Sequence, residues 1–528
     1  MAFITVDRSQ ANLFGYCIED FAKSDAKSRF VVDIVSRLKL DSLFTRYSDQ
    51  GGDSYAPDMM LALWFYAYSN GITSTRKLEE LYRYDTRYIY MSANLKPDHT
   101  TLSRFRQAHL DLISEYFVQI VLFAQESGIT DLNHIAIDGT KIKASANAKH
   151  SYKEDQLKQK IEAIRRDINL YMNVCDNVER GINEIYDLAS IHEEKKRLEF
   201  LEKELIERQK QLQDRKSNLK PEHRNNHSIN LVDPDARFMN KTDGPGYNAQ
   251  IAVDDSHCFI LANDVTDDPN DKNQFSSMHQ KTEEHLPENS ARQYTTDSGY
   301  HSLEQLEYIE NNAIDAVIAD PTPENRSLSS KPASIEKLIK ENTKLNRKDS
   351  IYHLEDDYYE CPAGQKLTRL RKKKNITIYQ SNNCGSCPLI HLCLKKTNNN
   401  RQIVRDDREN IAEKMAVKLK TESAKIRMKI RAISAEPVFG NLKHNLGFRS
   451  FSLRGLGKVK AEFNLMCIAH NLNILFSLMQ FNRLTTAIAE SNVVISQHIT
   501  ISKIILAIFI HIAGKFKMST SRLKYGFI

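Results

Sequence analysis

LNHIAIDGTKIKASAN, residues 132–147, is the stretch that decides the fold class of this 528-residue chain. Its apolar run stops at Asp138 and is followed by Gly139, which is typical of a buried strand that ends in a carboxylate. ARQYTTDSGYHS, residues 291–302, has the same form and places Asp297 at the end of a second strand. Open α/β sheets hold ligands at the carboxyl ends of their strands, so both aspartates are candidate site residues. The alternative is that both cap turns, as aspartates beside glycine often do.

Strands and helices alternate around these two stretches. GYNAQIAVDDSHCFILANDVT, residues 246–266, has β-rich runs on either side of a polar turn at Asp254, which indicates a hairpin. A helix is expected from Ser302, and the apolar residues 316–319 predict a further strand. This alternation predicts an α/β core, which we place within residues 131–480.

The first 130 residues are expected to be helical, because apolar residues recur there at spacings of three and four. Within them, KPDHTTLSRFRQAH (residues 96–109) predicts a helix that Asp98 caps and whose exposed face carries Arg104 and Arg106. A helix, a short turn and a second helix with basic residues near its start form the outline of a helix-turn-helix DNA reader. A plain helical bundle with an exposed arginine face is the alternative.

A helical hairpin is predicted to interrupt the core at residues 150–220. Glycine and proline almost vanish there, charged residues dominate, and apolar residues recur in steps of four and three. The apolar positions are Leu157, Ile161, Ile164, Ile168, Tyr171 and Cys175, followed by Leu198, Leu201 and Leu205. The segment contributes no acid at a strand end, so we interpret it as an insertion.

Four of the eight cysteines gather in a polar module at residues 355–405. Cys384 and Cys387 form a tight pair, flanked by Cys361 and Cys393. Tetrahedral zinc takes four soft ligands, which such a set can supply, and His391 could replace one cysteine. A structural Zn²⁺ site and four unligated cysteines are both consistent with this spacing.

Composition and charge set broad limits on the function. The formal net charge of +6 comes from 74 basic and 68 acidic residues, so the chain is only mildly basic. Dense basic runs at 366–374 and 425–431 could pair with phosphates, although each could also be an ordinary solvated surface.

The ends of the chain suggest a protein of the cytoplasm with no membrane partner. The N-terminus lacks the pattern of a secretory signal. The C-terminal tail, 481–528, contains an apolar stretch at 499–514 that falls short of the roughly 20 apolar residues of a membrane span. We expect this stretch to be a buried helix.

A third acid is predicted in the C-terminal part of the core. Glu436 and Lys443 are seven residues apart, so on a continuous helix they would share a face, with Arg427 and Arg431 upstream. A carboxylate for metal and cations for phosphate would then line one groove. Pro437 disfavours helical geometry at Glu436, so we expect a kink or a helix that restarts there. The alternative is an amphipathic helix with surface charges.

Four blocks of this sequence resemble insertion-sequence transposases that carry a DDE triad on a ribonuclease-H-like core. They are AIDGTKIKASAN, GYNAQIAVD, TTDSGY and EPVFGNLKHNLGFRSFSLRGLGKVKAEFNLMCIAHNL. The resemblance implies that Asp138, Asp297 and Glu436 are the catalytic, metal-binding triad and that Lys443 is the signature lysine. Met428 departs from this pattern, since it stands where the family has tyrosine, and Arg431 lies one residue farther from Glu436 than usual.

The resemblance also implies the activity, the cofactor and the partners. Such enzymes cut double-stranded DNA at the terminal inverted repeats of a mobile element and join the ends to target DNA with Mg²⁺ or Mn²⁺. Lys443 and Arg431 would contact the DNA backbone, and a homodimer or larger assembly is expected because two ends are held together. A catalytically silent DNA-binding descendant and a nuclease without joining activity are the alternatives.

Overall fold

The computed structural model describes most of the chain. The described residues are 3–4, 7, 17–23, 26–47, 53–130, 132–180, 188–217, 227–239, 242–288, 292–321, 335, 339–340, 344–353, 355–394 and 400–490. Contacts divide the chain into two units, Met1–Ile474 and Leu475–Ile528. In the second unit only the end of helix α16 (Leu456–Glu490) is described, so the expected buried helix at 499–514 lies outside the described residues.

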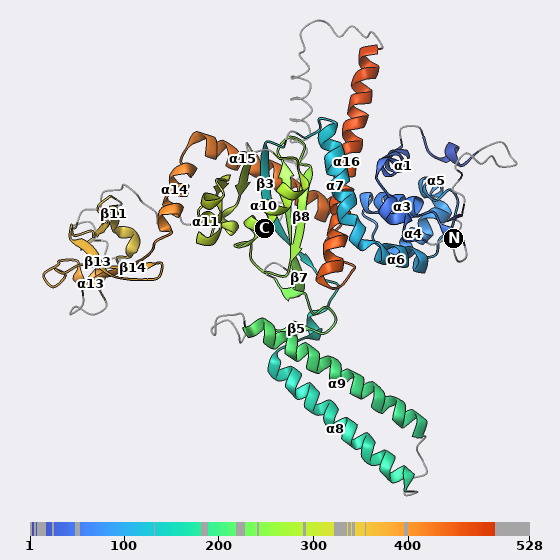
Figure 1. Ribbon diagram of the computed structural model, residues 1–528, viewed down its shortest axis with the longest axis horizontal. Coiled ribbons are helices and arrows are strands. Elements are labelled where there is room, and N and C mark those ends of the chain that lie inside the picture. Colours follow the sequence, from blue (N-terminus) through green and yellow to red (C-terminus); the bar gives the residue numbers. More distant parts are fainter. Residues whose placement is uncertain are drawn as a thin grey trace, which may run out of the picture. The chain divides into compact units, whose positions relative to one another are not determined.

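A six-stranded mixed sheet forms the centre of the first unit (Figure 1). The strand order is β10-β9-β3-β7, and β7 also pairs with β8 and with the short β6. β3 runs parallel to β9, as β9 does to β10, whereas β7 runs antiparallel to β3 and β8. The strands are β3 (His134–Lys143), β6 (Arg237–Phe238), β7 (Pro245–Asp254), β8 (Ile260–Thr266), β9 (Gln293–Thr296) and β10 (Asp315–Ile318). The predicted hairpin across Asp254 is β7–β8, and the α/β fold is confirmed.

The prediction that the first strand ends at Asp138 is wrong, because β3 continues to Lys143. The two neighbours of β3 have different lengths. Pairing with β9 stops at Ile137, whereas pairing with β7 continues to the last residue of β3, Lys143, opposite Gly246. Asp138 therefore lies where one neighbouring strand ends, in the middle of its own strand.

The sheet is in contact with the helices α10 (Gln274–His285), α14 (Glu409–Leu419) and α15 (Glu422–Gly440). A further helix, α11 (Leu303–Asn311), contacts α10 and α14. α10 contacts β7 and β8, whereas α15 contacts β3, β7, β9 and β10. Arg427 fixes α15 to the sheet, since its guanidinium donates to Asp315 Oδ1 at 2.9 Å and to the Tyr294 carbonyl at 2.8 Å. The expectation that Arg427 shares a phosphate-binding groove is therefore wrong, because the residue is buried against β9 and β10.

α15 continues through Pro437, so the predicted restart of the helix at this residue does not occur. Proline has no N–H, so it cannot donate the helical hydrogen bond to the carbonyl four residues earlier, at Ile433. Cys258 Sγ lies 3.9 Å from that carbonyl and supplies a donor in its place. After Gly440 the chain forms one π-helical turn, η8 (Asn441–Asn445), which carries Lys443.

The N-terminal part of the first unit is helical, as predicted. Its main helices are α1 (Lys27–Arg37), α3 (Pro57–Ser69), α4 (Thr75–Tyr84), α5 (Thr86–Met91), α6 (His99–Ala108) and α7 (Ile113–Glu126). α3 is the core of this group, because all but one of its side chains are buried. The prediction that Asp98 caps α6 is confirmed, since its carboxylate accepts from the Thr101 N–H at 2.6 Å.

Arg104 is exposed on α6, but the prediction that Arg106 is exposed beside it is wrong. The Arg106 guanidinium lies over the Trp64 ring and donates to the Tyr68 hydroxyl at 3.0 Å. Tyr68 in turn donates to Glu462, a fully buried carboxylate at the start of α16. A buried carboxylate needs hydrogen-bond donors, and the Ser452 N–H and hydroxyl and the Leu453 N–H also donate to Glu462. Arg106 is the cation at the other end of this buried network.

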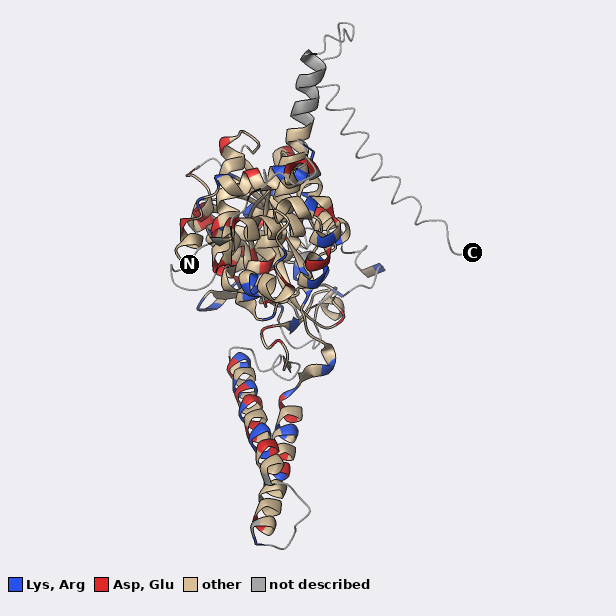
Figure 2. Cartoon of the chain, turned by 90° about the vertical axis from the view of Figure 1, so that its right-hand side faces the viewer, with Lys and Arg blue, Asp and Glu red and all other residues tan. Residues whose placement is uncertain are grey.

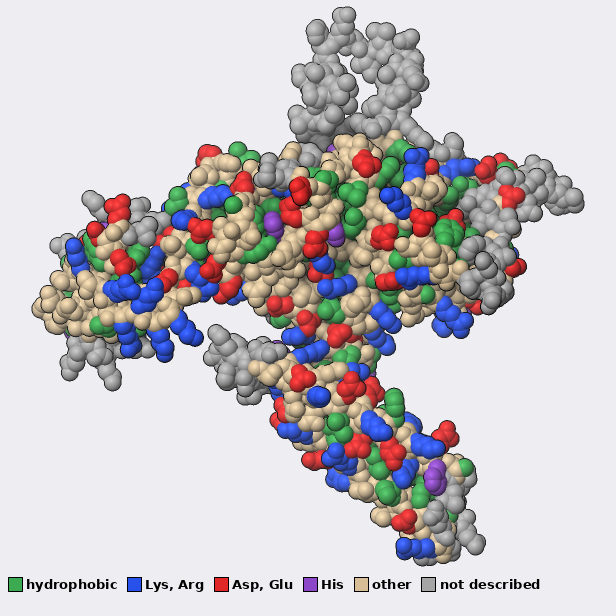
Figure 3. Space-filling view, in the orientation of Figure 1, with side chains coloured by type: hydrophobic (Ala, Val, Ile, Leu, Met, Phe, Trp, Pro, Cys, Tyr) green, Lys and Arg blue, Asp and Glu red, His purple; other side chains and the backbone are tan. Residues whose placement is uncertain are grey.

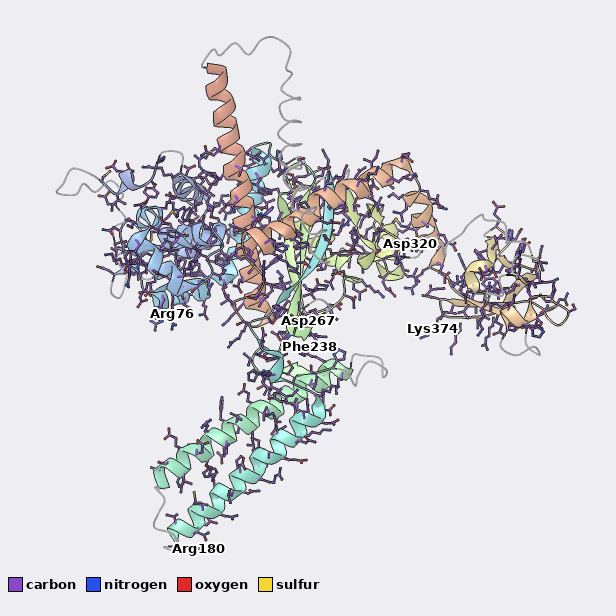
Figure 4. The ribbon with its side chains drawn as sticks, turned by 180° about the vertical axis from the view of Figure 1, so that it is seen from behind. Arg76, Arg180, Phe238, Asp267, Asp320 and Lys374 are labelled. Carbon is purple, nitrogen blue, oxygen red and sulfur yellow. The ribbon has the colours of Figure 1, made fainter. Side chains whose placement is uncertain are left out.

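Two long helices, α8 (Glu154–Glu179) and α9 (Leu188–Ser217), occupy the segment predicted as a hairpin and contact each other. Figure 2 shows acidic and basic residues interspersed along both helices, and Figure 4 shows Arg180, the C-cap of α8, at the end of that helix. Leu157, Ile161, Leu205 and Leu212 form the buried seam. Leu201, which the heptad pattern assigned to this seam, is 39% exposed.

The cysteine-bearing module contains a five-stranded antiparallel sheet that the sequence analysis did not predict. Its strands, in order, are β11 (Ile351–His353), β12 (Tyr358–Glu360), β13 (Lys366–Lys373), β14 (Ile376–Gln380) and β15 (Gln402–Asp406). All residues of β13 except Leu367 are exposed, and Figure 3 shows lysine and arginine side chains gathered on this sheet. Lys374, labelled in Figure 4, lies in the turn that follows β13.

No helix in the described part of the chain is long and apolar enough to span a membrane.

We predict that Arg106→Ala destabilises the protein by about 3 kcal/mol, because it removes the cation of this buried network and leaves the Tyr68 hydroxyl and the Thr73 carbonyl without this donor. Thermal unfolding at neutral pH measures the effect. Arg104→Ala, two residues away on the exposed face of α6, is the matched control and should change the stability by less than about 0.5 kcal/mol. Equal effects of the two substitutions would contradict the assigned role of Arg106.

Candidate active site

The parallel pairing of β3 with β9 places two acids side by side. Ile137 pairs with Thr296, and the next residue of each segment is an acid: Asp138 within β3 and Asp297 directly after β9. Asp138 Oδ1 accepts from the Gly139 N–H at 2.8 Å, and Asp297 Oδ1 accepts from the Gly299 N–H at 2.9 Å. Asp297 therefore caps the turn that follows β9, as the alternative interpretation proposed, whereas Asp138 lies inside β3 and caps no turn. Asp297 uses only one carboxylate oxygen for the cap, so capping and a role in a site are compatible.

Glu436, on α15, is linked to Asp138 on β3 by Arg431, which forms an ion pair with each of them. The Arg431 guanidinium lies between two acids, with Nη1 3.6 Å from Asp138 Oδ2 and Nη2 3.4 Å from Glu436 Oε1. Arg431 is nearly buried, with 11% of its side chain exposed, whereas the Glu436 side chain is 63% exposed. Arg431 thus faces the carboxylates and neutralises part of their charge.

The three acids affect one another electrostatically. Burial raises the pKa of Asp138 from its ordinary value to about 6. Arg431 and the Gly139 N–H act against this shift, whereas the charges of Asp297 and Glu436 raise the pKa further. The Asp138 carboxyl is therefore near a second and a third negative charge, as a shared cation site requires.

A fourth acid, Asp271, which the sequence analysis missed, lies beside these residues. It sits in the loop between β8 and α10, and its Oδ1 accepts from Lys141 Nζ at 3.1 Å. The side-chain amides of Asn248 and Gln250 on β7 each donate to the same oxygen at 2.7 Å. Loops lack the periodicity that marks strands and helices, so only the polar cluster DDPNDKN, residues 267–273, could have drawn attention to Asp271.

Gly139 permits this close arrangement. A Cβ atom at Gly139 would collide with the Gln250 side-chain amide and would lie 2.8 Å from Asp271 Oδ1. Tyr300, fully buried, donates its hydroxyl to Gln250 Oε1. Burial and the negative charges of Asp271, Asp138 and Asp297 raise the pKa of Tyr300 well above its ordinary value, so the phenol stays neutral and remains a donor.

Lys443 also contacts β3 near the acids. From the π-helical turn η8, its ammonium donates to Thr140 Oγ1 at 2.6 Å and to the Lys141 carbonyl at 2.8 Å. These two residues follow Asp138 on the same strand. Lys443 therefore holds the part of β3 just beyond the acids, although it does not share a continuous α-helix with Glu436.

Asp254, the other acid of the central hairpin, does not belong to this group. It pairs with Ile135, toward the start of β3, and accepts backbone N–H groups from His257 and Phe259 within its own turn. Burial raises the pKa of Asp254 to about 6, as it does for Asp138. Asp254 is thus a buried acid of similar pKa with a structural role.

The donor set fits a hard divalent cation. Mg²⁺ and Mn²⁺ prefer carboxylate oxygens, and Asp138, Asp297 and Glu436 supply them next to one another. Among the described residues, no three His, Cys, Asp or Glu side chains already stand as a metal-coordinating group. Arg431 explains this for Glu436, because the ion pair holds that carboxylate and would have to open before Glu436 could bind a cation.

We predict that Asp138→Asn stabilises the metal-free protein at pH 8. Folding raises the pKa of the Asp138 carboxyl from 3.8 to about 6. The folded protein therefore loses stability as the pH rises through this range, because the unfolded chain releases the proton more readily. Asparagine removes this loss, which amounts to about 2–3 kcal/mol at pH 8 and vanishes near pH 4. Thermal unfolding in a metal chelator across this pH range measures the difference. Asp254→Asn, with a similarly raised pKa, should behave alike, and a destabilised Asp138→Asn variant at pH 8 would contradict the assignment.

Two family models match parts of the chain. A transposase DDE domain matches residues 360–476, and a transposase domain known as DUF772 matches residues 17–108. No curated protein matches the chain. The first match contains Glu436 and Lys443, whereas Asp138 and Asp297 lie between the two matches, where the sheet brings them to the same site. The chain therefore contains a transposase DDE domain at residues 360–476 and a second transposase domain at residues 17–108, and together they support the insertion-sequence DDE transposase family.

Proposed function

We propose that this transposase cleaves DNA at the terminal inverted repeats of a mobile element and joins the ends to target DNA with Mg²⁺ or Mn²⁺. The observation that carries the proposal is the position of Asp138 on β3 and of Asp297 directly after the adjacent parallel strand β9, with Glu436 presented to β3 by α15. Three neighbouring carboxylates suit phosphoryl transfer, because that chemistry needs metal ligands and no protein nucleophile.

The strand order supports a ribonuclease-H-like core. In chain order, β3, β7 and β8 form an antiparallel meander, and β9 and β10 then add in parallel on the other side of β3. The result is the order β8-β7-β3-β9-β10, with α10 between β8 and β9 and α11 between β9 and β10. We assign the first acid to β3, the second to the end of β9 and the third to α15.

In this proposal Asp138, Asp297 and Glu436 hold the metal ions. When bound, such ions activate a water or a DNA 3′-hydroxyl and stabilise the leaving oxygen during displacement at phosphorus. Asp271 accepts hydrogen bonds from the side chains of Lys141 on β3 and of Asn248 and Gln250 on β7, and so fixes these three side chains beside the acids. Arg431 neutralises Asp138 and Glu436 when no cation is bound.

DNA contacts are proposed for Arg104 on exposed α6, for Arg431 beside the acids, and for the exposed basic strand β13. Lys443, expected from the sequence as a DNA contact, is assigned instead to holding β3, because its ammonium donates to that strand. α5 and α6 are successive helices joined by residues 92–98, and the exposed Arg104 on α6 supports a DNA-binding role for this part of the chain. Arg106 is not proposed as a DNA contact, because it is buried and its guanidinium donates to Tyr68 and to the Thr73 carbonyl. A homodimer or larger assembly would hold the two DNA ends.

Two rival functions differ from this proposal in measurable ways. A catalytically silent DNA-binding descendant would have no reason to keep three acids, and here all three are present and close together. A metal-dependent nuclease without joining activity uses the same ligands. Only an assay that follows joining separates it from a transposase.

We predict that Asp138→Asn, Asp297→Asn and Glu436→Gln each lower cleavage of DNA carrying the element's ends by about 10³-fold or more. Loss of a metal ligand removes several kcal/mol of transition-state stabilisation, and each 1.36 kcal/mol is tenfold in rate. Asp254→Asn is the matched control and should keep full activity, because Asp254 caps a turn away from the site.

Strand transfer of pre-cleaved ends is measured with the same variants. Joining by the wild type supports the transposase, whereas cleavage without joining supports the nuclease. Binding without either reaction supports the silent descendant, and full activity in any triad variant removes that residue from the site.

For Lys443→Ala we predict cleavage reduced about tenfold or more, with no change in the salt dependence of DNA binding. Its ammonium holds β3 beside Asp138, so its loss should disturb the acids more than the DNA. Arg104→Ala is the control, since loss of one phosphate contact lowers the slope of log affinity against log salt by about 1. The same reduction of slope in Lys443→Ala would identify Lys443 as a DNA contact instead.

A further inference from the structure

We propose that Cys361, Cys384, Cys387 and Cys393 bind one structural Zn²⁺, which fastens the five-stranded sheet that carries the basic strand β13. The four residues lie at three places in the chain: after β12, in the segment that follows β14, and in the short helix α13 (Ile390–Cys393). This site is separate in residues and in ligand chemistry from the carboxylate site of the central sheet.

All four cysteines line the same small cavity, which has a volume of about 20 Å³. Most of the remaining lining is apolar and includes Leu345, Leu389 and Leu394. None of the four forms a disulfide. A cavity with room for about one water-sized particle, walled by four free thiols, is of the size and composition that a single soft cation requires.

The backbone turns around the cysteines point N–H groups at sulfur. At Cys361 the chain makes a tight turn, with the Gly364 N–H bonded to the Cys361 carbonyl at 2.8 Å, and the N–H groups of Ala363 and Gln365 donate to the Cys361 thiol. The Arg401 N–H lies 3.3 Å from Cys384 Sγ. Because N–H donors stabilise a thiolate more than a thiol, these turns are arranged for metal-bound sulfur.

The thiols still have to move closer together. Among the described residues no three His, Cys, Asp or Glu side chains already stand as a metal-coordinating group. All four cysteines nevertheless line the same cavity. Binding of the cation would draw the four sulfurs toward one centre within it.

The ligand chemistry selects zinc over the cations of the proposed active site. Thiolates are soft ligands that favour Zn²⁺, whereas Mg²⁺ and Mn²⁺ favour carboxylates. His391, which the sequence offered as a replacement for one cysteine, is exposed and does not line the cavity. The site therefore has four sulfur ligands.

The five-stranded sheet has a small hydrophobic core, so a bound metal would add stability that the core does not supply. Among the described residues its buried core consists of Tyr359, Leu367, Tyr379 and Ile403, and a core of this size provides little stability by itself. A metal bound by the turn after β12 and by the segment between β14 and β15 ties together both sides of the β13–β14 hairpin. The basic strand β13 is thereby held in a fixed shape for contact with DNA phosphates.

The test is the zinc content of the full-length protein, purified without added chelator and measured by mass spectrometry of the metal. We expect one zinc per chain, and loss of most of it in each of Cys361→Ser, Cys384→Ser, Cys387→Ser and Cys393→Ser. His391→Ala and Cys17→Ser should retain it, because His391 is exposed and Cys17 lies outside the cavity. Wild-type protein without zinc and with four reduced thiols, or zinc retained by the cysteine variants, would overturn the proposal.

Two further measurements keep the result interpretable. If the cysteine variants do not fold, Co²⁺ reconstitution of the wild type decides, since tetrahedral thiolate ligation gives a sulfur-to-cobalt charge-transfer band and its absence rejects the site. Glu436→Gln should lose cleavage and keep zinc. Failure of the proposed function and failure of the zinc site are thus separate outcomes.

Discussion

The parallel pairing of β3 with β9 is the interaction on which the candidate site depends. These strands are about 160 residues apart in the chain, and their register aligns Ile137 with Thr296. A shift of one residue would turn one of the two following aspartates to the opposite face of the sheet. The register is maintained by burial, because the residues of β3 before Asp138 and most of β9 are inaccessible to solvent.

α15 brings the third acid to this strand, and its position depends on two arginines with different roles. Arg427 is buried against β9 and β10 and fixes the helix to the sheet. Arg431, one helical turn later, lies between Asp138 and Glu436 and balances charge in the site. An arginine thus anchors the helix at one turn, and another arginine faces the acids at the next turn. The different roles of Arg427 and Arg431 follow only from the position of α15 on the sheet.

Much of the architecture could be predicted because local patterns carry it. The strands that contain Asp138 and precede Asp297, the β7–β8 hairpin and the helix capped by Asp98 all follow from apolar periodicity and turn residues. The five-stranded sheet was missed, because its strands are short and polar and bury few side chains. Arg106 and Leu201 were misplaced for a related reason, since periodicity does not reveal which face of a helix meets a partner.

The sequence by itself determined the candidate acids, the spacing of the cysteines and the family blocks, because these are properties of neighbouring residues. Only the tertiary structure decided that Asp138 lies in mid-strand, that Asp271 joins the acids and that Arg106 serves a buried glutamate. It also decided that four cysteines line one cavity. Each of these outcomes depends on hydrogen bonds and packing between residues far apart in the chain, such as Arg106 with Tyr68 and Lys443 with Thr140. Such contacts are set by the balance of burial and charge in the whole fold, which no local pattern records.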